Sequence, residues 1–188
     1  MNRPIHPGHA QPAMNDLAAV QAAAPPRDTA ARSQAPRHSL RTGVLACAGV
    51  FAAIAVLSVA SFHWGTLLLL GSFGSTAVMV FTFPELHFSQ PRSVVGGHVI
   101  CTAVGLGALA LFGATWWSLA AAAAACVALM MCTRTLHPPA GSNPLIVFLS
   151  APKWSFLLLP TLLGAVTLVI VALAYHRATR RPYPAYWW

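Results

Sequence analysis

Acidic side chains are almost absent from this sequence. Its 188 residues include 3 Asp and Glu against 11 Lys and Arg, and charged residues make up 7% of the chain. Beyond the first 40 residues the acidic count falls to Glu85 alone, so no apolar segment contains a carboxylate. Soluble domains carry about 25% charged residues. The composition therefore excludes an ordinary soluble domain, and it argues against an acidic cation pathway or an intramembrane hydrolase built on carboxylates or a metal.

Cysteine is also scarce, and its spacing carries no metal or redox signature. The four cysteines fall within apolar segments without a Cys-x-x-Cys pair, and we interpret them as small buried hydrophobic residues (Cys47, Cys101, Cys126 and Cys132). No nucleophile–base pair is visible, no apolar signal-peptide region lies near the start, and no soluble basic face suits nucleic acid. We expect no enzyme activity, no cofactor, no metal and no nucleic-acid partner.

Apolar residues, by contrast, dominate the chain. They account for 57% of the sequence, and the mean hydropathy is +0.65. This composition predicts an integral membrane protein in a lipid bilayer. Three regions are expected: a disordered, Pro/Ala-rich N-terminal tail at 1–40, a transmembrane domain at 41–176, and a short basic and aromatic C-terminal tail at 177–188.

The apolar stretches predict an all-α membrane protein with four full transmembrane helices. These helices cover about residues 42–62, 94–112, 116–132 and 155–175. Two further apolar segments, 65–83 and 136–149, are interrupted by glycine or proline and are expected to be re-entrant or broken. The alternative is an arrangement of six crossings in which both interrupted segments also cross.

The basic residues predict the orientation of the helices. The four arginines nearest to the first span precede it, and three follow the last span (Arg27, Arg32, Arg37, Arg41, Arg177, Arg180 and Arg181). Both termini are therefore expected on the cytoplasmic side of the inner (plasma) membrane, which requires an even number of crossings. Arg92 and Arg134 favour six crossings, because both then lie inside, while Lys153 lies outside.

A weak internal repeat relates the two interrupted segments. Residues 74–81 match residues 141–148 at Gly, Ser, Val and Phe, with an offset of 67, and Gly97 and Gly164 share this offset. Two units of three segments would be inverted in the membrane, an arrangement common in transporters. Chance similarity in a chain rich in Ala, Gly and Val remains the alternative.

The interrupted segments also hold the candidate binding residues. A glycine turn followed by a helix start would direct free backbone N–H groups at a small anion. We predict such ends at Gly74-Ser75-Thr76 and Gly141-Ser142-Asn143, where the side chains could instead cap the helices.

Histidine supplies the titratable groups of the predicted pathway. His137 could accept or release a proton as an anion passes, because imidazole titrates nearest to physiological pH. Its alternative role is a neutral ring bonded to a carbonyl freed by Pro138 or Pro139. His98 is the second candidate, on a span where Gly96 and Gly97 permit close helix approach.

Three motifs carry a family resemblance. Thr133–Ile146 reads TRTLHPPAGSNPLI, Gly71–Ala77 reads GSFGSTA, and Gln90–His98 reads QPRSVVGGH. Together they resemble the HPP family of integral membrane proteins over residues 42–175. The resemblance implies a stand-alone domain of four membrane helices and a transporter, since plastid and cyanobacterial members are linked to nitrite transport. Ser142-Asn143-Pro144 departs from the smaller, less polar residues of many relatives, which leaves the solute open.

The residues and the resemblance together predict a transporter or channel for a small anion such as nitrite. The alternative is a membrane sensor or assembly module that binds without conducting. Small residues on the helices also predict a homo-oligomer, through glycines and the run 120–125.

Overall fold

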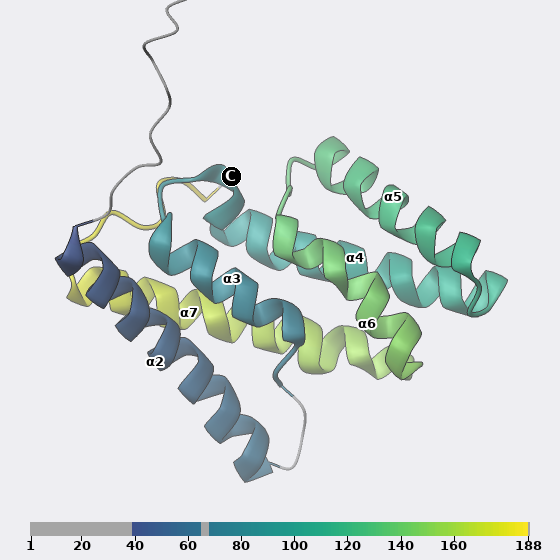
Figure 1. Cartoon of the computed structure of the whole chain (residues 1–188), viewed down its shortest axis with the longest axis horizontal. Coiled ribbons are helices and arrows are strands. Elements are labelled where there is room, and N and C mark those ends of the chain that lie inside the picture. Colours follow the sequence, from purple (N-terminus) through teal and green to yellow (C-terminus); the bar gives the residue numbers. More distant parts are fainter. Residues whose placement is uncertain (1–38, 65–67, 188) are drawn as a thin grey trace, which may run out of the picture. The chain divides into compact units, whose positions relative to one another are not determined.

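The structure of the protein is a computed structural model that describes residues 39–64 and 68–187. Within these ranges all regular structure is helical (Figure 1), which confirms the predicted all-α class. The predicted N-terminal tail lies almost entirely outside the described residues. The helices are α2 (Leu40–Trp64), α3 (Gly71–Thr82), α4 (Pro91–Phe112), α5 (Trp116–Cys132), α6 (Asn143–Ser150) and α7 (Leu163–Ala178). Shorter 3₁₀ or π turns are η1 (His87–Ser89), η2 (Pro138–Ser142), η3 (Trp154–Leu157) and η4 (Leu158–Leu162).

Three helical stretches are long and apolar enough to cross a membrane. They are Leu40–His63, Pro91–Phe112 and Trp154–Ala178. Helix α5 is apolar but shorter, with 17 residues. The predicted span at 155–175 is not one regular helix, because Leu159 has extended backbone angles (φ −129°, ψ 116°) immediately before Pro160. A proline in a helix removes a backbone donor and clashes with the preceding turn, so the break has a local cause.

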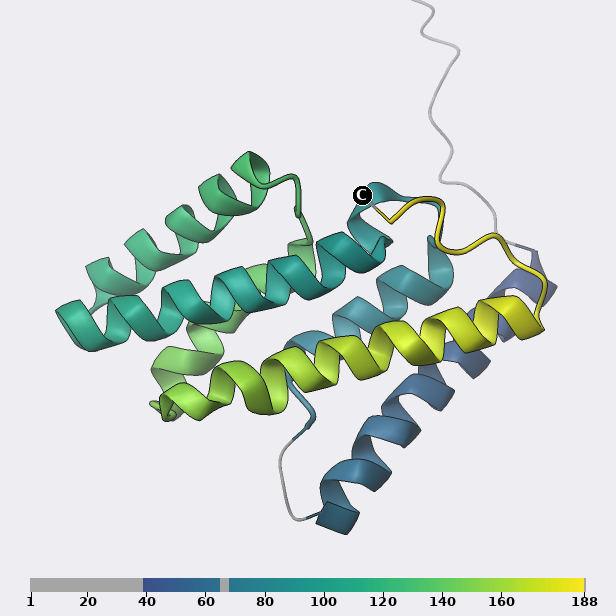
Figure 2. The ribbon, with the colours of Figure 1, turned by 180° about the vertical axis from the view of Figure 1, so that it is seen from behind.

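The helices of the described region pack in two groups. Helices α2, α3 and α7 share the larger apolar core, whose fully buried members include Leu57, Phe73, Phe81 and Leu168. Helices α4 and α5 pack with η2 around a smaller core. Helices α4 and α7 run side by side where the groups meet (Figure 2). The first group thus contains α2, α3 and the last helix, α7, whereas the second contains α4 and the two elements that follow it, α5 and η2.

Hydrogen bonds bring several helix ends to one end of this bundle. The Tyr175 hydroxyl donates to the Leu45 carbonyl at 2.7 Å, which joins the end of α7 to the start of α2. The Arg92 guanidinium donates to the Thr133 carbonyl at 2.6 Å, which joins the start of α4 to the end of α5. The arginines of the described region all flank these ends (Arg41, Arg92, Arg134, Arg177, Arg180 and Arg181).

The C-terminal segment is fastened to the connection between α3 and α4. The Tyr183 hydroxyl donates to the Ser89 carbonyl at 3.0 Å, and the Ala185 N–H donates to the Gln90 side-chain oxygen at 2.8 Å. Burial raises the pKa of the Tyr183 phenol, so the group remains a neutral donor. The Gln90 amide nitrogen donates in turn to the Pro84 and Leu86 carbonyls.

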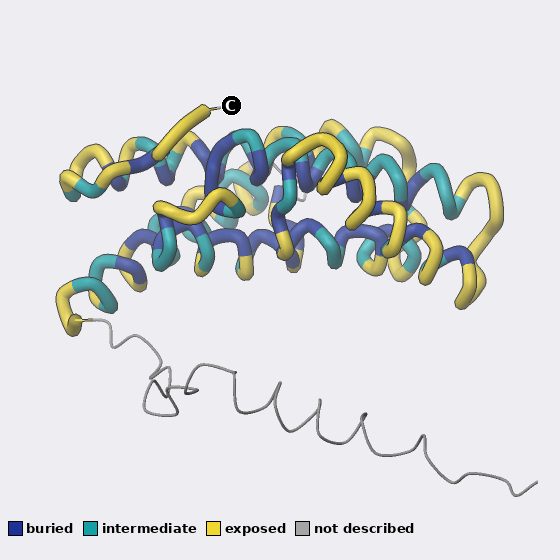
Figure 3. The backbone as a smooth tube through the Cα atoms, turned by 90° about the horizontal axis from the view of Figure 1, so that it is seen from above, coloured by how far each residue is buried: buried dark blue, intermediate teal, exposed yellow. Residues whose placement is uncertain are grey.

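Burial separates the faces of the helices. Buried positions lie along the sides where helices meet, and exposed positions lie outward (Figure 3). Large apolar side chains on the outer surface include Phe51, Phe62, Leu111, Trp116 and Leu149. An apolar outer face suits contact with lipid, because lipid offers no polar partner.

Candidate functional site

Four polar side chains form a buried cluster where α3, α4 and the η2–α6 segment meet. We refer to Thr76, His98, His137 and Asn143 as the histidine cluster, and each of the four is at most 1% exposed. The Thr76 hydroxyl oxygen lies 2.8 Å from His98 Nε2 and 2.9 Å from His137 Nε2. Phe73 packs edge-on against the His98 ring, with the ring centroids 4.9 Å apart. Polar groups at such depth are costly unless they are hydrogen-bonded, so their pairing defines the site.

The position of His137 follows from the two prolines after it. A residue before proline favours extended backbone, and His137 has φ −139° and ψ 98° at the start of η2. Its ring therefore lies beside η1, where Nδ1 is 2.7 Å from the Phe88 carbonyl oxygen. A carbonyl can only accept, so His137 Nδ1 carries the hydrogen. In the neutral ring Nε2 is then an acceptor for the Thr76 hydroxyl, whose single hydrogen can also reach the Ser72 carbonyl oxygen at 3.0 Å.

Two glycines let α4 approach the segment that carries His137. A Cβ atom added at Gly97 would lie 2.8 Å from the His137 Cβ and 3.1 Å from the Thr135 carbonyl oxygen. A Cβ added at Gly96 would lie 2.7 Å from the Thr135 Cγ2. The close approach expected at these glycines is therefore made to the non-helical stretch 135–137, where a helix was predicted as the partner.

Asn143 determines which nitrogen of His98 carries hydrogen. The Asn143 amide nitrogen lies 3.2 Å from the His98 carbonyl oxygen, 3.1 Å from His98 Nδ1 and 2.9 Å from the Thr102 hydroxyl. Because the amide has two hydrogens for three acceptors, one of them is shared between the carbonyl oxygen and Nδ1 of His98. Turning the amide over would set its oxygen against the His98 carbonyl, so the nitrogen must face it. His98 Nδ1 is consequently an acceptor, and His98 Nε2–H donates to Thr76.

These assignments give one continuous chain of hydrogen bonds. Asn143 donates to His98, His98 to Thr76, Thr76 to His137, and His137 to the Phe88 carbonyl. Every member is neutral in this arrangement. Two buried oxygens beside the chain, Asn143 Oδ1 and Ser72 Oγ, have no hydrogen-bond partner among the described residues. An unpaired buried oxygen would stabilise a polar guest that can donate to it.

The structure brings together half of the predicted binding residues. His137, His98, Thr76 and Asn143 join the histidine cluster, whereas four others lie outside it (Gly74, Ser75, Gly141 and Ser142). Ser75 is exposed, and the Ser142 hydroxyl donates to the Pro139 carbonyl at 2.9 Å.

The predicted helix starts need correction. Helix α3 begins at Gly71, so the first-turn N–H groups belong to Gly71 and Ser72, and the predicted start at Gly74–Thr76 is wrong. Helix α6 does begin at Asn143, but the Asn143 N–H already donates to the Ala140 carbonyl of η2. Side chains of Thr76 and Asn143, rather than free helix ends, face the site.

Thr102 is a member of the site that sequence reasoning missed. Its hydroxyl accepts from Asn143 and lies 3.2 Å from the Thr161 hydroxyl, which links α4 to η4. A usable signal existed, because Thr102 follows His98 by four residues and residues so spaced share one helix face.

A basic pocket of about 460 Å³ lies next to the histidine cluster. This basic pocket is lined by His87, Arg92, Ser93, Met130, Met131, Arg134, Leu136 and Tyr186. These eight residues include no acidic one. Arg134 is exposed and has a left-handed backbone (φ 57°), a conformation that most residues avoid and that recurs at functional sites. Leu136 lines the pocket and precedes His137, so the pocket adjoins the buried site.

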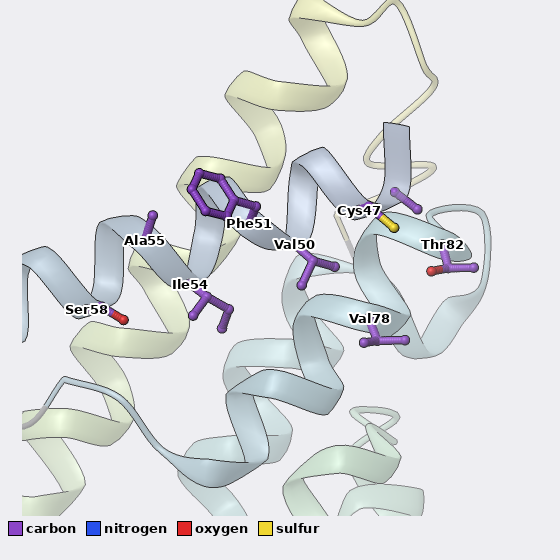
Figure 4. Close-up of a pocket in the computed structure, with 9 residues that line it drawn as sticks. Cys47, Val50, Phe51, Ile54, Ala55, Ser58, Val78 and Thr82 are labelled. Carbon is purple, nitrogen blue, oxygen red and sulfur yellow. The ribbon is translucent and has the colours of Figure 1, made fainter. Parts of the chain in front are cut away.

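An apolar hollow of about 690 Å³ lies between α2 and α3 (Figure 4). Val50 and Ile54 of α2 point toward Val78 of α3, Phe51 also lines the hollow, and Cys47 and Thr82 lie at one end. This lining suits an acyl chain better than a charged solute. No group of three or more His, Cys, Asp or Glu side chains in the described ranges could hold a metal.

Comparison with known proteins identifies the family. Residues 35–184 match the family described as HPP, transmembrane region. Two Dictyostelium discoideum proteins, both described as transmembrane proteins, are 32% identical over 150 residues and 35% identical over 129 residues. These matches cover 72% and 64% of this chain, and the chain spans about half the length of the curated relatives it matches (48% and 45%). Neither description names an enzymatic activity, and no solved structure matches. The sequence motifs around His137, the apolar helices and these matches agree: the chain belongs to the HPP family of membrane-spanning proteins.

Proposed function

We propose that this protein carries a small anion such as nitrite across the membrane, as a transporter or channel, and that the histidine cluster lines the pathway. The observation that carries the proposal is the chain of hydrogen bonds from Asn143 to the Phe88 carbonyl, buried inside an apolar bundle. Polar and ionisable groups are costly inside a membrane and typically mark a solute pathway.

The charge distribution supports an anion as the solute. The basic pocket is lined by Arg92, Arg134 and His87, and also by Leu136, which directly precedes His137 in the chain. Positive charge at the mouth of a site raises the local concentration of anions and their rate of association. Beside the histidine cluster, the Ser72 hydroxyl has no hydrogen-bond partner among the described residues, and it could donate to an oxyanion such as nitrite.

We further propose that the chain consists of two inverted units of three segments, α2–α3–α4 and α5–η2/α6–α7. The offset of 67 carries the start of α3 at Gly71 to Pro138, where η2 begins, and the start of α4 at Pro91 to Leu158, where η4 begins. This agreement in helix boundaries supports the repeat that the sequence predicts.

Reciprocal contacts between the units support the same relation. A Cβ at Gly97 of the first unit would lie 3.1 Å from the Thr135 carbonyl of the second unit. A Cβ at Gly164 of the second unit would lie 2.7 Å from the Leu68 carbonyl of the first unit. Both glycines and both carbonyl residues are 67 positions apart, as expected of units related by a two-fold axis in the membrane plane.

The histidine cluster lies at the junction of these proposed units. Thr76 and Asn143 are also 67 positions apart, and they bond to the two ring nitrogens of His98 from opposite units. Binding sites of inverted-repeat transporters form where the short, broken helices meet near the midplane.

With two inverted units of three segments, all six would cross and both termini would lie on one side. The arginines gathered at one end of the bundle support a cytoplasmic location for both, in the plasma membrane. An exposed face of small residues on α5 supports a homo-oligomer (Ala120, Ala121, Ala124, Ala125 and Ala128).

Complete burial of the histidine cluster favours one alternative function. The four side chains of the cluster are at most 1% exposed. A site so enclosed could bind a solute and signal its presence without letting it cross, as a membrane sensor or assembly module would. Such a protein would bind nitrite in detergent but would not speed its passage into vesicles.

Light-scattering measurements on reconstituted vesicles test the proposed function. Vesicles containing the protein should swell faster in nitrite than protein-free vesicles, with no difference in an uncharged solute of similar size. Ser75→Ala is a matched control, because Ser75 lies on α3 next to Thr76 but is exposed. Equal rates with and without protein would exclude transport, and nitrite binding without uptake would establish the sensor.

A further inference from the structure

We propose that His137 is a proton-binding site and that the protein moves one proton together with each monovalent anion. This inference rests on the proposed function and names the proton as the ion whose gradient drives anion transport. It is carried by the hydrogen-bond geometry of one hydroxyl group, Thr76, which has more partners than its single hydrogen can serve.

Three polar atoms surround the Thr76 hydroxyl oxygen. They are the Ser72 carbonyl oxygen at 3.0 Å, His98 Nε2 at 2.8 Å and His137 Nε2 at 2.9 Å. His98 supplies its own hydrogen, because Asn143 holds the opposite ring nitrogen as an acceptor. The hydroxyl hydrogen therefore has two acceptors within reach, His137 Nε2 and the Ser72 carbonyl.

Each choice of acceptor corresponds to one protonation state of His137. When the hydroxyl donates to His137 Nε2, the ring is neutral and its only hydrogen, on Nδ1, bonds to the Phe88 carbonyl. When the hydroxyl turns to the Ser72 carbonyl, its oxygen can accept a hydrogen from His137 Nε2. A proton added at Nε2 forms one N–H bond and raises the ring charge by one. Only the hydroxyl hydrogen must rotate, and every heavy atom stays in place.

His98 has no such freedom. Protonation of its Nδ1 would set an N–H against the Asn143 amide nitrogen, which the His98 carbonyl and the Thr102 hydroxyl hold in position. The two rings lie 5.1 Å apart between centroids, so a charge on one also disfavours a charge on the other. The added proton is thus confined to His137.

The surroundings of His137 link its proton to an anion. The groups that face it are the neutral His98 of α4, Thr76 of α3 and the Phe88 carbonyl of η1. The His87 ring lies tilted by 47° against the Phe88 ring, with the centroids 3.7 Å apart. Arg92 and Arg134 line the basic pocket together with Leu136, and no acidic residue is among the described residues of that lining, so a buried imidazolium at His137 would have no carboxylate partner there. An anion beside His137 would supply the missing negative charge, so proton and anion should bind together and cross without net charge.

Proteoliposomes with an internal pH indicator test this coupling. An inward nitrite gradient, applied at neutral pH where little nitrous acid forms, should acidify the interior by one proton per nitrite. Uptake should not respond to a potassium-diffusion potential. Protein-free vesicles correct for nitrous acid that crosses the lipid.

Two variants of Thr76 isolate the hydroxyl. Thr76→Val keeps the shape but removes the rotating hydrogen, so protein-dependent proton uptake should fall about tenfold, in keeping with one lost hydrogen bond to a charged ring. Thr76→Ser keeps the hydroxyl and should retain most of the uptake. Equal uptake by both variants would overturn the role of Thr76.

The outcomes separate this inference from the proposed function. Nitrite uptake that responds to voltage and brings no protons would overturn the proton site and leave transport intact. If the protein moves no nitrite, the proposed function fails, and the proton site is then decided by ¹⁵N NMR of labelled histidine in detergent. An imidazolium signal from His137 that strengthens on addition of nitrite is expected, and its absence would overturn the inference.

Discussion

The two short helical segments, α3 and η2–α6, begin in different ways although their first residues, Gly71 and Pro138, are 67 positions apart. Helix α3 starts as a regular helix at Gly71 and carries Thr76 in its second turn. The η2–α6 segment starts with a 3₁₀ turn at Pro138 and carries Asn143 as the first residue of its α-helix. Each presents one polar side chain to His98. A hydroxyl can exchange donor and acceptor roles by rotation, whereas the Asn143 amide is fixed by three partners, so one side of the site adapts and the other holds its orientation.

The residues that precede the two segments differ most. Leu70 precedes α3 and His137 precedes η2, both with extended backbone and 67 positions apart. His137→Leu would give the second segment the residue of the first. We expect nitrite uptake to fall roughly a hundredfold, because the Thr76 hydroxyl and the Phe88 carbonyl lose their partner. Uptake into vesicles, with a membrane-fraction immunoblot to check insertion, measures the effect, and unchanged uptake would remove His137 from the mechanism.

The next largest effect is expected at the two glycines where the proposed units contact each other. Gly97→Ala and Gly164→Ala should each lower the free energy of unfolding by about 1–3 kcal/mol, because the added methyl group overlaps packed atoms. Gly107→Ala on α4 is the matched control, since nothing lies within 4 Å of the added atom, and it should stabilise the helix by about 0.5–1 kcal/mol. Unfolding in detergent measures all three variants. A loss at Gly97 without one at Gly164 would contradict the reciprocal contact.

Replacing Asn143, whose amide keeps a fixed orientation, should have a moderate effect on stability. Asn143→Leu deletes the donor to His98 and Thr102, at a cost of about 1 kcal/mol for each hydrogen bond lost. The more telling change is in His98, which should lose its single tautomer and give averaged ¹⁵N signals. A His98 spectrum that stays as in the unaltered protein would show that Asn143 does not set the direction of the chain.

The smallest effect is expected at the two serines that share the offset of 67 but lie outside the histidine cluster. Ser75→Ala and Ser142→Ala should each change stability by less than about 0.5 kcal/mol and leave uptake unchanged. Ser75 is exposed, and among the described residues the Ser142 side chain bonds to the Pro139 carbonyl of its own turn alone. A strong loss of uptake in either variant would return the predicted helix ends to the pathway.

The helices could be predicted well where an apolar run has clear ends. The predicted span 116–132 agrees with α5 in both bounds, since Thr115 caps its start through a capping box with Ser118. The start of α3 could not be predicted, because glycines normally interrupt helices. Here Phe73 and Phe81 are fully buried in the larger core, and that packing outweighs the low helix propensity of Gly74.

The candidate site could be predicted only in part. His137 stood out because a titratable ring and two prolines interrupt an apolar stretch. Its pairing with Thr76, 61 residues earlier in the chain, depends on how closely α4 approaches at Gly97. No periodicity encodes such an approach. The interruption at Pro160 was missed for a different reason, because a single proline in an apolar run leaves the hydropathy high.

The chain of hydrogen bonds has two closed ends, and this has an energetic consequence for a cell. At one end the Phe88 carbonyl can accept a hydrogen but has none to hand on, and at the other the Asn143 amide is held in place by the His98 carbonyl. A proton can therefore reside in the cluster, yet it cannot hop from one end of the chain to the other as it would along a water wire. In the proposed mechanism, the protein without bound anion would therefore leave the proton-motive force undissipated.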